Sequence, residues 1–341
     1  MKRVMTLLSL LFLMAPTGFA APQRPSSLQD SFRNWGLVKI ASNIKKAWEI
    51  TRGSPHVVVA VIDTGIDPKH PDLKPNLWRA PGKRDTPVYG WDFVNRSPNP
   101  SDPHGHGTHI AGIIGAIANP RVGTSGVAPS VQIMPIRYYS EMAPGSINLA
   151  NTIKALHYAI DNGAQIINYS GGGPEYSEEE FLAMRKAEAK GILIVAAAGN
   201  ERNNTDREDR RYYPAAYQLK GLKNIITVAS IDSEDQILPS SNWGIRSVDV
   251  AAPGEGILST IPGNRYGKMT GTSQATAFVS GLAALILSKA PTLSPSQVKD
   301  IILKSATRVS GLVGKVASGG KINANQALTL IEAGRSTASK N

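Results

Sequence analysis

Apolar runs that alternate with helical patterns are the feature that most constrains the fold of this chain. Five runs have the composition of strands, and they cover residues 57–62, 131–136, 165–169, 192–197 and 225–229. The first four are apolar almost without interruption, as expected for parallel strands that are covered on both faces. Helical patterns lie between or after them, at residues 44–51, 106–118, 147–162, 178–190, 273–289, 295–305 and 324–333. The alternation predicts an α/β fold with a doubly wound, mainly parallel sheet and helices on both faces.

Such folds form their sites just beyond the carboxyl ends of the strands, and this chain places polar residues there. Asp63 directly follows the first apolar run. A cluster of His104, His106 and His109 opens one helical pattern, and Ser273 opens another. A serine in the first turn of a helix lies beside free backbone N–H groups and the positive end of the helix dipole. We therefore consider Ser273 well placed to stabilise a developing oxyanion.

Each of these residues has an ordinary structural explanation when it is considered alone. A serine at a helix start is usually an N-cap, and an aspartate after a strand is commonly a turn or capping residue. The histidines could ligate a metal, but the spacing H-E-x-x-H is absent and no cysteine or glutamate accompanies them. The combination favours nucleophilic catalysis, because a serine needs a neutral imidazole to accept its proton and the imidazole needs a carboxylate on its other nitrogen. Spacing alone does not choose among the three histidines.

Four motifs in the same order make the chain resemble the subtilisin-like serine proteases over residues 35–332. The matching segments are Val59-Ala60-Val61-Ile62-Asp63-Thr64-Gly65, His106-Gly107-Thr108-His109-Ile110-Ala111-Gly112, Ala196-Ala197-Ala198-Gly199-Asn200 and Gly271-Thr272-Ser273. The chain also keeps the family's order of Asp, His and Ser. The resemblance implies the subtilisin-like form of the α/β fold and the hydrolysis of peptide bonds through an acyl-enzyme.

The resemblance implies a role for each matching residue. Ser273 would be the nucleophile, His106 the general base and then the acid, and Asp63 the residue that orients the imidazole. The H-G-T-H match is what selects His106. The side-chain amide of Asn200 and the backbone N–H of Ser273 would hold the oxyanion. This chemistry requires no cofactor.

The resemblance also implies where a peptide substrate binds. Ser170, Gly171 and Gly172 match the family's binding strand, and glycines there let a peptide backbone approach closely. The alternative is a plain turn after the run 165–169. Tyr212 matches the base of the primary specificity pocket, where a tyrosine would make the pocket shallow.

A structural calcium ion is the one bound group that the family pattern suggests. Asp72 matches a calcium ligand of the family, and the loop that contains Asn119 lies where further ligands are expected. Calcium prefers oxygen ligands of this kind. Pro120 and Arg121 depart from the family's loop, and Arg121 brings a positive charge to it.

The N-terminus has the pattern of a secretory signal. Lys2 and Arg3 precede a short apolar run, and small residues close the segment 1–20. The alternative is an uncleaved anchor. We therefore expect a signal peptide at 1–20, a short extension at 21–34 with no propeptide domain, a peptidase domain at 35–333 and a polar tail at 334–341. The mature protein would be secreted or periplasmic and would have no stable association with the membrane.

Composition limits the classes of partner that we expect this chain to bind. The chain has no cysteine, so it has neither disulfides nor a cysteine nucleophile, and its net charge of +11 comes from scattered basic residues. We expect protein or peptide substrates, no nucleic acid partner and a monomer. Two alternatives stay open. One is a catalytically silent binding or scaffold protein on the same fold. The other is an esterase, against which the missing G-x-S-x-G motif argues.

Overall fold

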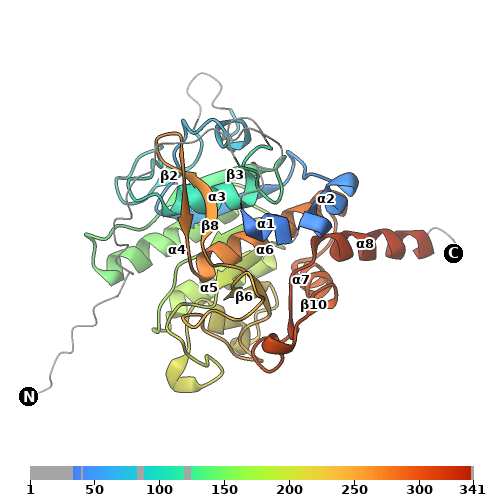
Figure 1. Cartoon of the computed structure of the whole chain (residues 1–341). Coiled ribbons are helices and arrows are strands. Elements are labelled where there is room, and N and C mark those ends of the chain that lie inside the picture. The colour runs from blue at the N-terminus through green and yellow to red at the C-terminus, as the bar shows by residue number, and fades with distance from the viewer. Residues whose placement is uncertain (1–33, 40, 83–87, 119–123, 339–341) are drawn as a thin grey trace, which may run out of the picture.

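A nearly all-parallel sheet organises the part of the chain that the structure, a computed structural model, describes: residues 34–39, 41–82, 88–118 and 124–338 (Figure 1). Within these residues the main sheet has nine strands in the order β10-β11-β7-β6-β5-β4-β1-β3-β2. Every neighbouring pair is parallel except β10 and β11. The predicted fold class is therefore confirmed.

The strands follow the predicted apolar runs closely where the runs are buried. Their bounds are β1 (Val58–Asp63), β2 (Trp91–Asp92), β3 (Gln132–Arg137), β4 (Ile166–Tyr169), β5 (Leu193–Ala197), β6 (Ile225–Ile231), β7 (Val250–Pro253), β8 (Ile257–Ile261), β9 (Arg265–Met269), β10 (Thr307–Arg308) and β11 (Gly320–Lys321). β8 and β9 form a separate antiparallel pair. The sequence analysis missed six strands: β2, β10 and β11 have two residues each, β7 has four and ends in a proline, β8 contains the polar Ser259 and Thr260, and β9 is mostly polar and partly exposed.

The helices also lie where the periodic patterns predict them, apart from the five-residue α1, which the patterns did not predict. Their bounds are α1 (Trp35–Lys39), α2 (Ala41–Ile50), α3 (His106–Gly115), α4 (Gly145–Asp161), α5 (Glu178–Ala189), α6 (Thr272–Lys289), α7 (Pro295–Lys304) and α8 (Ala324–Ala338). Short 3-10 turns are η2 (Lys74–Asn76), η3 (Glu208–Arg210), η4 (Ala215–Lys220) and η5 (Ser310–Leu312). None of the helices in the described residues is long and apolar enough to cross a membrane.

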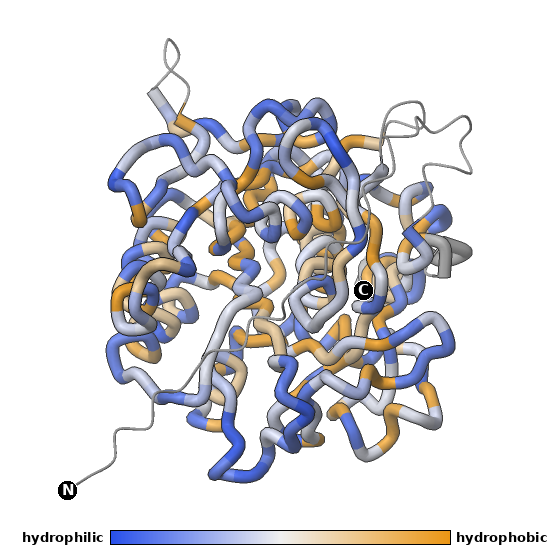
Figure 2. The backbone as a smooth tube through the Cα atoms, turned by 60° about the vertical axis from the view of Figure 1, so that its left-hand side comes forward, coloured by the Kyte–Doolittle hydropathy of each residue, from blue (hydrophilic) through white to orange (hydrophobic). Residues whose placement is uncertain are grey.

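Both faces of the sheet are covered, as the continuous apolar runs predict. Val59 and Val61 of β1 point into a core that they share with α3 and α6. Ala60 and Ile62, one residue along, point into a second core with α4 and α5. Successive side chains of a strand alternate between faces, so a strand that is covered twice must be apolar at every position. Hydrophobic segments accordingly run through the interior in Figure 2, and hydrophilic ones occupy many of the outer loops.

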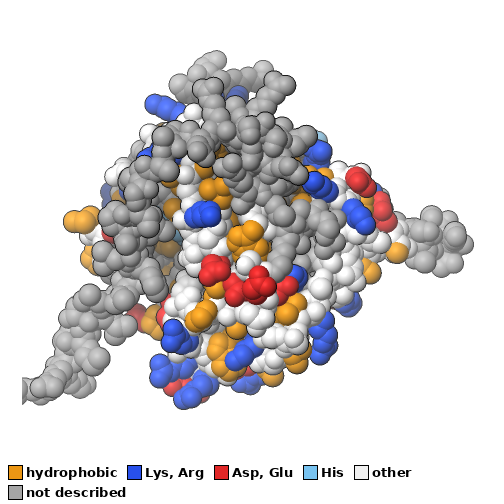
Figure 3. All heavy atoms as spheres, viewed as in Figure 1, with side chains coloured by type: hydrophobic (Ala, Val, Ile, Leu, Met, Phe, Trp, Pro, Cys, Tyr) orange, Lys and Arg blue, Asp and Glu red, His pale blue; other side chains and the backbone are white. Residues whose placement is uncertain are grey.

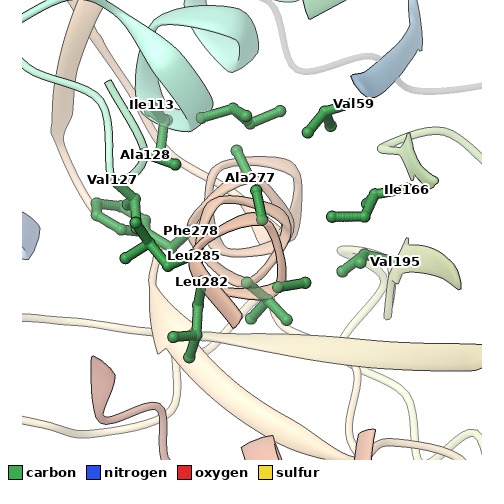
Figure 4. Close-up of a cluster of buried hydrophobic side chains, with 14 of the residues drawn as sticks. Val59, Ile113, Val127, Ala128, Ile166, Val195, Ala277, Phe278, Leu282 and Leu285 are labelled. Carbon is green, nitrogen blue, oxygen red and sulfur yellow. The ribbon is translucent and has the colours of Figure 1, made fainter. Parts of the chain in front are cut away.

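Helix α6 is the most deeply buried helix of the first core. Its side chains from Thr272 to Leu287 are all buried. Phe278, Leu282 and Leu285 pack among side chains from the strands and from the segment after α3 (Figure 4). Its sequence carries no charge before Lys289, which is what a helix enclosed by protein requires.

Several predicted features lie outside the described residues. They are the signal peptide 1–20, all but the last residue of the extension 21–34, Asn119 of the expected calcium loop and the last three residues of the polar tail. On the face shown in Figure 3, Lys and Arg side chains lie at several separate places, with Asp and Glu between some of them.

The burial of α6 leads to a prediction for stability. Leu285→Ala removes a side chain that is 0% exposed, and we expect it to lower the free energy of unfolding by about 2–5 kcal/mol, measured by urea unfolding. Leu330→Ala on α8, where the leucine is 41% exposed, is the control and should change it by less than about 1 kcal/mol. Equal effects of the two substitutions would contradict the central place of α6.

Candidate active site

Three of the residues that the sequence analysis singled out lie at the carboxyl end of the sheet. Asp63 is the last residue of β1, His106 is the first residue of α3, and Ser273 is the second residue of α6. His106 and Ser273 lie 43 and 210 residues after Asp63 in the chain. They come to the same edge because parallel strands all present their carboxyl ends there.

Asp63 and His106 form a short, partly buried hydrogen bond. His106 Nδ1 lies 2.7 Å from Asp63 Oδ1, and Asp63 is 4% exposed. The backbone N–H of Thr64 donates to the same oxygen at 2.7 Å. Burial by itself lowers the pKa of His106, but the charge of Asp63 and its hydrogen bond outweigh burial, so the pKa lies above its usual 6.5. The pair leaves Nε2 as the imidazole nitrogen available to another group.

Gly107 allows this pair to form. A Cβ at Gly107 would collide with the Gly65 carbonyl oxygen and would lie 3.1 Å from the Asp63 Cβ. The space is too small for any side chain, so only glycine lets the start of α3 approach the end of β1. The Gly after His106 in the sequence motif is therefore a packing requirement.

Asp102 is a buried residue that the sequence analysis missed. It accepts hydrogen bonds from Gly105 N at 2.8 Å, from Thr108 Oγ1 at 2.6 Å and from Thr64 Oγ1 at 2.9 Å. These bonds hold the turn before His106 against the end of β1. The sequence signal was available, since Asp102 precedes a proline and an Asp at a turn commonly accepts a hydrogen bond from the backbone two residues on, as Asp102 does from His104 N.

Ser273 lies in the first turn of α6, directly after Gly271 and Thr272, and is 8% exposed. Its hydroxyl donates to the Ser170 carbonyl oxygen at 3.1 Å. Among the described residues no hydrogen bond joins this hydroxyl to His106. Contacts between a nucleophile and its base are often long without substrate and shorten in the complex.

Asn200 is oriented by the residue before Ser273. The Thr272 backbone N–H donates to Asn200 Oδ1 at 3.0 Å. This bond assigns the oxygen of the amide, so the Nδ2 group is directed elsewhere and has no partner among the described residues. Gly199, with φ +97°, sits in the left-handed region and turns the chain after β5 so that Asn200 reaches α6.

The expected binding strand continues β4. Ser170 follows Tyr169, the last residue of β4, and the Gly173 N–H donates to the Tyr213 carbonyl at 2.9 Å. The Tyr212 ring lies close to two glycines. A Cβ on Gly172 would lie 2.5 Å from its Cε1, and a Cβ on Gly199 would lie 3.1 Å from its Cδ2. The structure thus places Tyr212 between the segments after β4 and β5, and burial raises its pKa.

Glu180 of α5 is a second buried carboxylate that sequence reasoning missed. It is 3% exposed and accepts hydrogen bonds from Tyr169 Oη at 3.0 Å and Tyr217 Oη at 2.8 Å. Burial raises the pKa of Glu180, while the two hydrogen bonds act in the opposite direction. The residue joins the end of β4 to η4, so it ties together the segments that carry Ser170 and Tyr212. In the sequence it is one of three consecutive glutamates at the start of α5, and nothing local marks it as the buried one.

The three histidines have different surroundings. His109 is 0% exposed, and its Nε2 lies 2.8 Å from the Ile257 carbonyl oxygen and 3.1 Å from that of Gly267. Burial, with the charge of His106, lowers the pKa of His109 to about 3, so its ring is neutral and structural. His104 contacts Glu141 at 3.2 Å. Within the described residues, no group of three or more His, Cys, Asp or Glu side chains is arranged to hold a metal ion.

Asp72 is a fully buried carboxylate with one oxygen in use. Oδ2 accepts a hydrogen bond from Tyr266 Oη at 2.9 Å, and Oδ1 has no hydrogen-bond partner among the described residues. Burial raises the pKa of Asp72, against the effect of the Tyr266 hydrogen bond. An unpartnered buried oxygen fits a ligand of a cation, since such an oxygen is otherwise costly. Asn119, the other expected ligand, lies outside the described residues.

The arrangement as a whole suits nucleophilic substitution at a carbonyl group. A hydroxyl at a helix start, an imidazole fixed by a buried carboxylate and an amide N–H group with no partner in the described part of the chain are the groups that such chemistry needs.

Comparison with protein families finds one that matches most of the chain. The model of the subtilase family matches residues 54–326. The chain is 38% identical over 283 residues to the thermophilic serine proteinase of Bacillus sp. strain AK1, a match that covers 83% of this chain and 64% of that protein. It is 37% identical over 305 residues to thermitase of Thermoactinomyces vulgaris, with 89% of this chain and 99% of thermitase covered.

Solved structures show the same likeness. A cold-adapted subtilisin-like serine proteinase superposes with a TM-score of 0.64 at 30% identity, covering 79% of this chain and 88% of the other. A protease from Pseudoalteromonas arctica superposes with a TM-score of 0.70 at 28% identity, covering 84% of this chain and 93% of the other.

Proposed function

The chain belongs to the subtilase family of subtilisin-like serine endopeptidases, and we propose that it cleaves peptide bonds in proteins with Asp63, His106 and Ser273 as its catalytic triad. The observation that carries the proposal is the 2.7 Å contact between Asp63 and His106 at the same sheet edge as Ser273. A catalytically silent protein would need neither this buried pair nor the free amide of Asn200.

The proposed reaction passes through an acyl-enzyme. Ser273 Oγ attacks the substrate carbonyl carbon while His106 Nε2 takes the hydroxyl proton, and Asp63 stabilises the resulting imidazolium. The imidazolium then gives this proton to the leaving amine as the C–N bond breaks. A water molecule attacks the ester in the same way, and its proton returns through His106 as Ser273 Oγ leaves. The products are two peptides and the free enzyme.

Asn200 and the start of α6 would stabilise the oxyanion. The Asn200 Nδ2 group and the Ser273 backbone N–H are donors that gain most when negative charge develops on the carbonyl oxygen. The Thr272 N–H bond to Asn200 Oδ1 supports this role because it fixes the amide before substrate arrives.

We propose that the substrate pairs as an extended strand with Ser170, Gly171 and Gly172. Tyr212 would form the base of the pocket for the residue before the cut bond. Its ring lies between Gly172 and Gly199, so the pocket would be shallow and would favour small or medium side chains.

The biological setting proposed is an exported one. The pattern at residues 1–20 supports secretion or a periplasmic location, and residues 35–333 would form the peptidase domain. We propose a monomer that acts on protein or peptide substrates and has no nucleic acid partner.

Calcium is proposed as a structural ion only. Asp72 would supply a carboxylate oxygen and Asn119 a side-chain oxygen, and the unpartnered Asp72 Oδ1 supports this assignment. The ion would tie the loop after α3 to the loop after β1 and would take no part in the chemistry.

The triad is tested by replacing its nucleophile. Ser273→Ala should abolish both labelling by a fluorophosphonate probe and peptide hydrolysis, because the attacking hydroxyl is then missing. Ser296→Ala, which changes an exposed serine on α7, is the control and should label fully. Full activity in a folded Ser273→Ala protein would rule out the assignment.

The oxyanion role predicts a defect in turnover. Asn200→Ala should lower kcat by about 10²–10³ with little change in KM, which is the effect known for the oxyanion-hole asparagine of subtilisin, a member of this family. Steady-state kinetics on one peptide measure both constants. A loss confined to KM would mean that Asn200 binds the ground state of the substrate.

If Tyr212 makes the pocket shallow, removing its side chain should improve the cleavage of peptides with a large residue before the cut bond. Tyr212→Gly should raise kcat/KM for peptides with Phe before the cut bond by about tenfold or more relative to Ala, since burying an aromatic side chain contributes about 1.5–3 kcal/mol. A peptide library with every residue at that position measures the change. Strong preference for Phe or Trp in the unchanged protein would refute the shallow pocket.

The calcium proposal predicts a stability effect. In a Ser273→Ala background, which prevents self-cleavage, a chelator should lower the thermal midpoint, and added calcium should restore it. Asp72→Asn should reduce this response. The same midpoint with chelator and with calcium would show that no such ion is bound.

A further inference from the structure

A pocket of about 350 Å³ opens beside the loop that carries Asn200. It is lined by two cations, Arg202 and Lys315, by Trp243, and by the apolar residues Ile237, Leu238 and Pro239. Ser241 is the remaining lining residue, so no carboxylate belongs to the wall. The proposed catalytic chemistry uses none of these side chains.

Hydrogen bonds join the wall of the pocket to the segment that carries Asn200. The Arg202 N–H donates to the Ser240 carbonyl at 2.9 Å, only two residues after Asn200. Asn242, which is 1% exposed, donates from its backbone N to the Gly199 carbonyl at 2.9 Å and from Nδ2 to the Ala198 carbonyl at 2.8 Å. These bonds fix the wall of the pocket to the segment that positions Asn200.

Both cations are held in place by contacts other than carboxylates. Arg202 Nε donates to the Pro239 carbonyl at 2.9 Å, and Lys315 Nζ lies 3.7 Å from the centroid of the Trp243 ring. Among the described residues neither forms a salt bridge. The neighbouring arginines differ, because each has a carboxylate within 4.0 Å: Arg207, Arg210, Arg211 and Arg246.

The nearest carboxylate in sequence, that of Glu201, is not part of the pocket wall. Glu201 Oε2 accepts a hydrogen bond from Asn242 Nδ2 at 2.6 Å and lies 2.5 Å from where a Cβ on Gly199 would be. Glu201 therefore lies on the side of Gly199 and Tyr212, whereas Arg202 lines the pocket. The pocket keeps an excess of positive charge.

The backbone at Arg202 adopts a conformation that is uncommon for residues other than glycine. Its φ is +59°, in the left-handed region that favours glycine. Such conformations persist where the surroundings enforce them, and they gather at ligand-binding sites. The N–H bond of Arg202 to the Ser240 carbonyl and its Nε bond to the Pro239 carbonyl hold this conformation at the pocket wall.

We propose that this pocket, which is tied to the segment that carries Asn200, is a subsite for a carboxylate of the substrate. The proposal rests on the proposed function. The carboxylate is the side chain of an Asp or Glu, or the C-terminal carboxylate of a short peptide. The guanidinium and ammonium groups would bind it, and the apolar wall would contact its aliphatic part.

Matched peptides test the proposal. One set of internally quenched peptides with amidated C-termini carries Asp, Asn or Lys in turn at each position on either side of the cut bond. A second set has neutral residues and ends in a free carboxylate or an amide. We expect kcat/KM for a carboxylate peptide to exceed that of its amide counterpart by about tenfold at one position, the size of a hydrogen-bonded charge pair. The preference should shrink as NaCl is added.

Two substitutions test whether the pocket causes the preference for a carboxylate. In Arg202→Gln and in Lys315→Gln, the ratio of kcat/KM for the carboxylate peptide to kcat/KM for its amide counterpart should fall towards one. Arg207→Gln, which removes an arginine that is already paired with Asp209, should keep the ratio of the unchanged protein. Equal kcat/KM for all matched pairs, or a preference that survives both Arg202→Gln and Lys315→Gln, would overturn the proposal.

A binding measurement separates this proposal from the proposed function. In Ser273→Ala protein, titration with the Asp and Asn peptides is followed by tryptophan fluorescence, with Trp243→Phe to identify the signal. Tighter binding of the Asp peptide would support the subsite even if the unchanged protein cleaved neither peptide. Equal binding would overturn it, even if the unchanged protein were an active endopeptidase.

Discussion

The burial of helix α6 against the parallel sheet is the constraint on which the rest of the structure depends. Because α6 is enclosed along most of its length, a ligand can reach only the free backbone N–H groups of its first turn. In this fold the first turn lies at the carboxyl edge of the sheet. Ser273 occupies it. The helix also carries polar groups through the core, since Ser280 Oγ donates to Asn168 Oδ1 at 2.8 Å and Asn168 Nδ2 donates to Ser170 Oγ at 2.9 Å. This buried chain of hydrogen bonds sets α6 relative to the strand that precedes the binding segment.

Buried polar residues between elements keep the site rigid. Asp102 holds the turn before His106, Asn242 holds the loop around Asn200, and Glu180 joins the end of β4 to η4. Each accepts or donates several hydrogen bonds where water is excluded, so losing one partner would leave others unpaired. Catalysis by fixed donors depends on this rigidity, because the donors must already point at the place where charge develops.

The residues proposed to set specificity lie in different structural elements from those proposed to break the bond. The groups proposed to break the bond stand at strand and helix ends, whereas Tyr212, Arg202 and the wall of the basic pocket belong to loops and short turns. Loops can change without disturbing the sheet, so one scaffold can serve different substrates. A tyrosine between two glycines and a cation pair beside Asn200 are features of this kind.

The sequence by itself determined the α/β fold and the identity of the triad candidates. Short runs such as 57–62 are apolar at every position, as strands covered on both faces are, and they alternate with helical patterns. Asp63, His106 and Ser273 stand in short local motifs that can be read from the sequence. Three features were decided only by the tertiary structure. It shows that His106 is the histidine whose ring contacts Asp63, and that Asp102 and Glu180 are buried and hydrogen-bonded. It also shows that Arg202 and Lys315 line the same pocket. Arg202 and Lys315 are 113 residues apart, and nothing local in either segment encodes the other. Their meeting depends on how β6, β11 and the loops between them pack, which is a property of the whole sheet rather than of any segment.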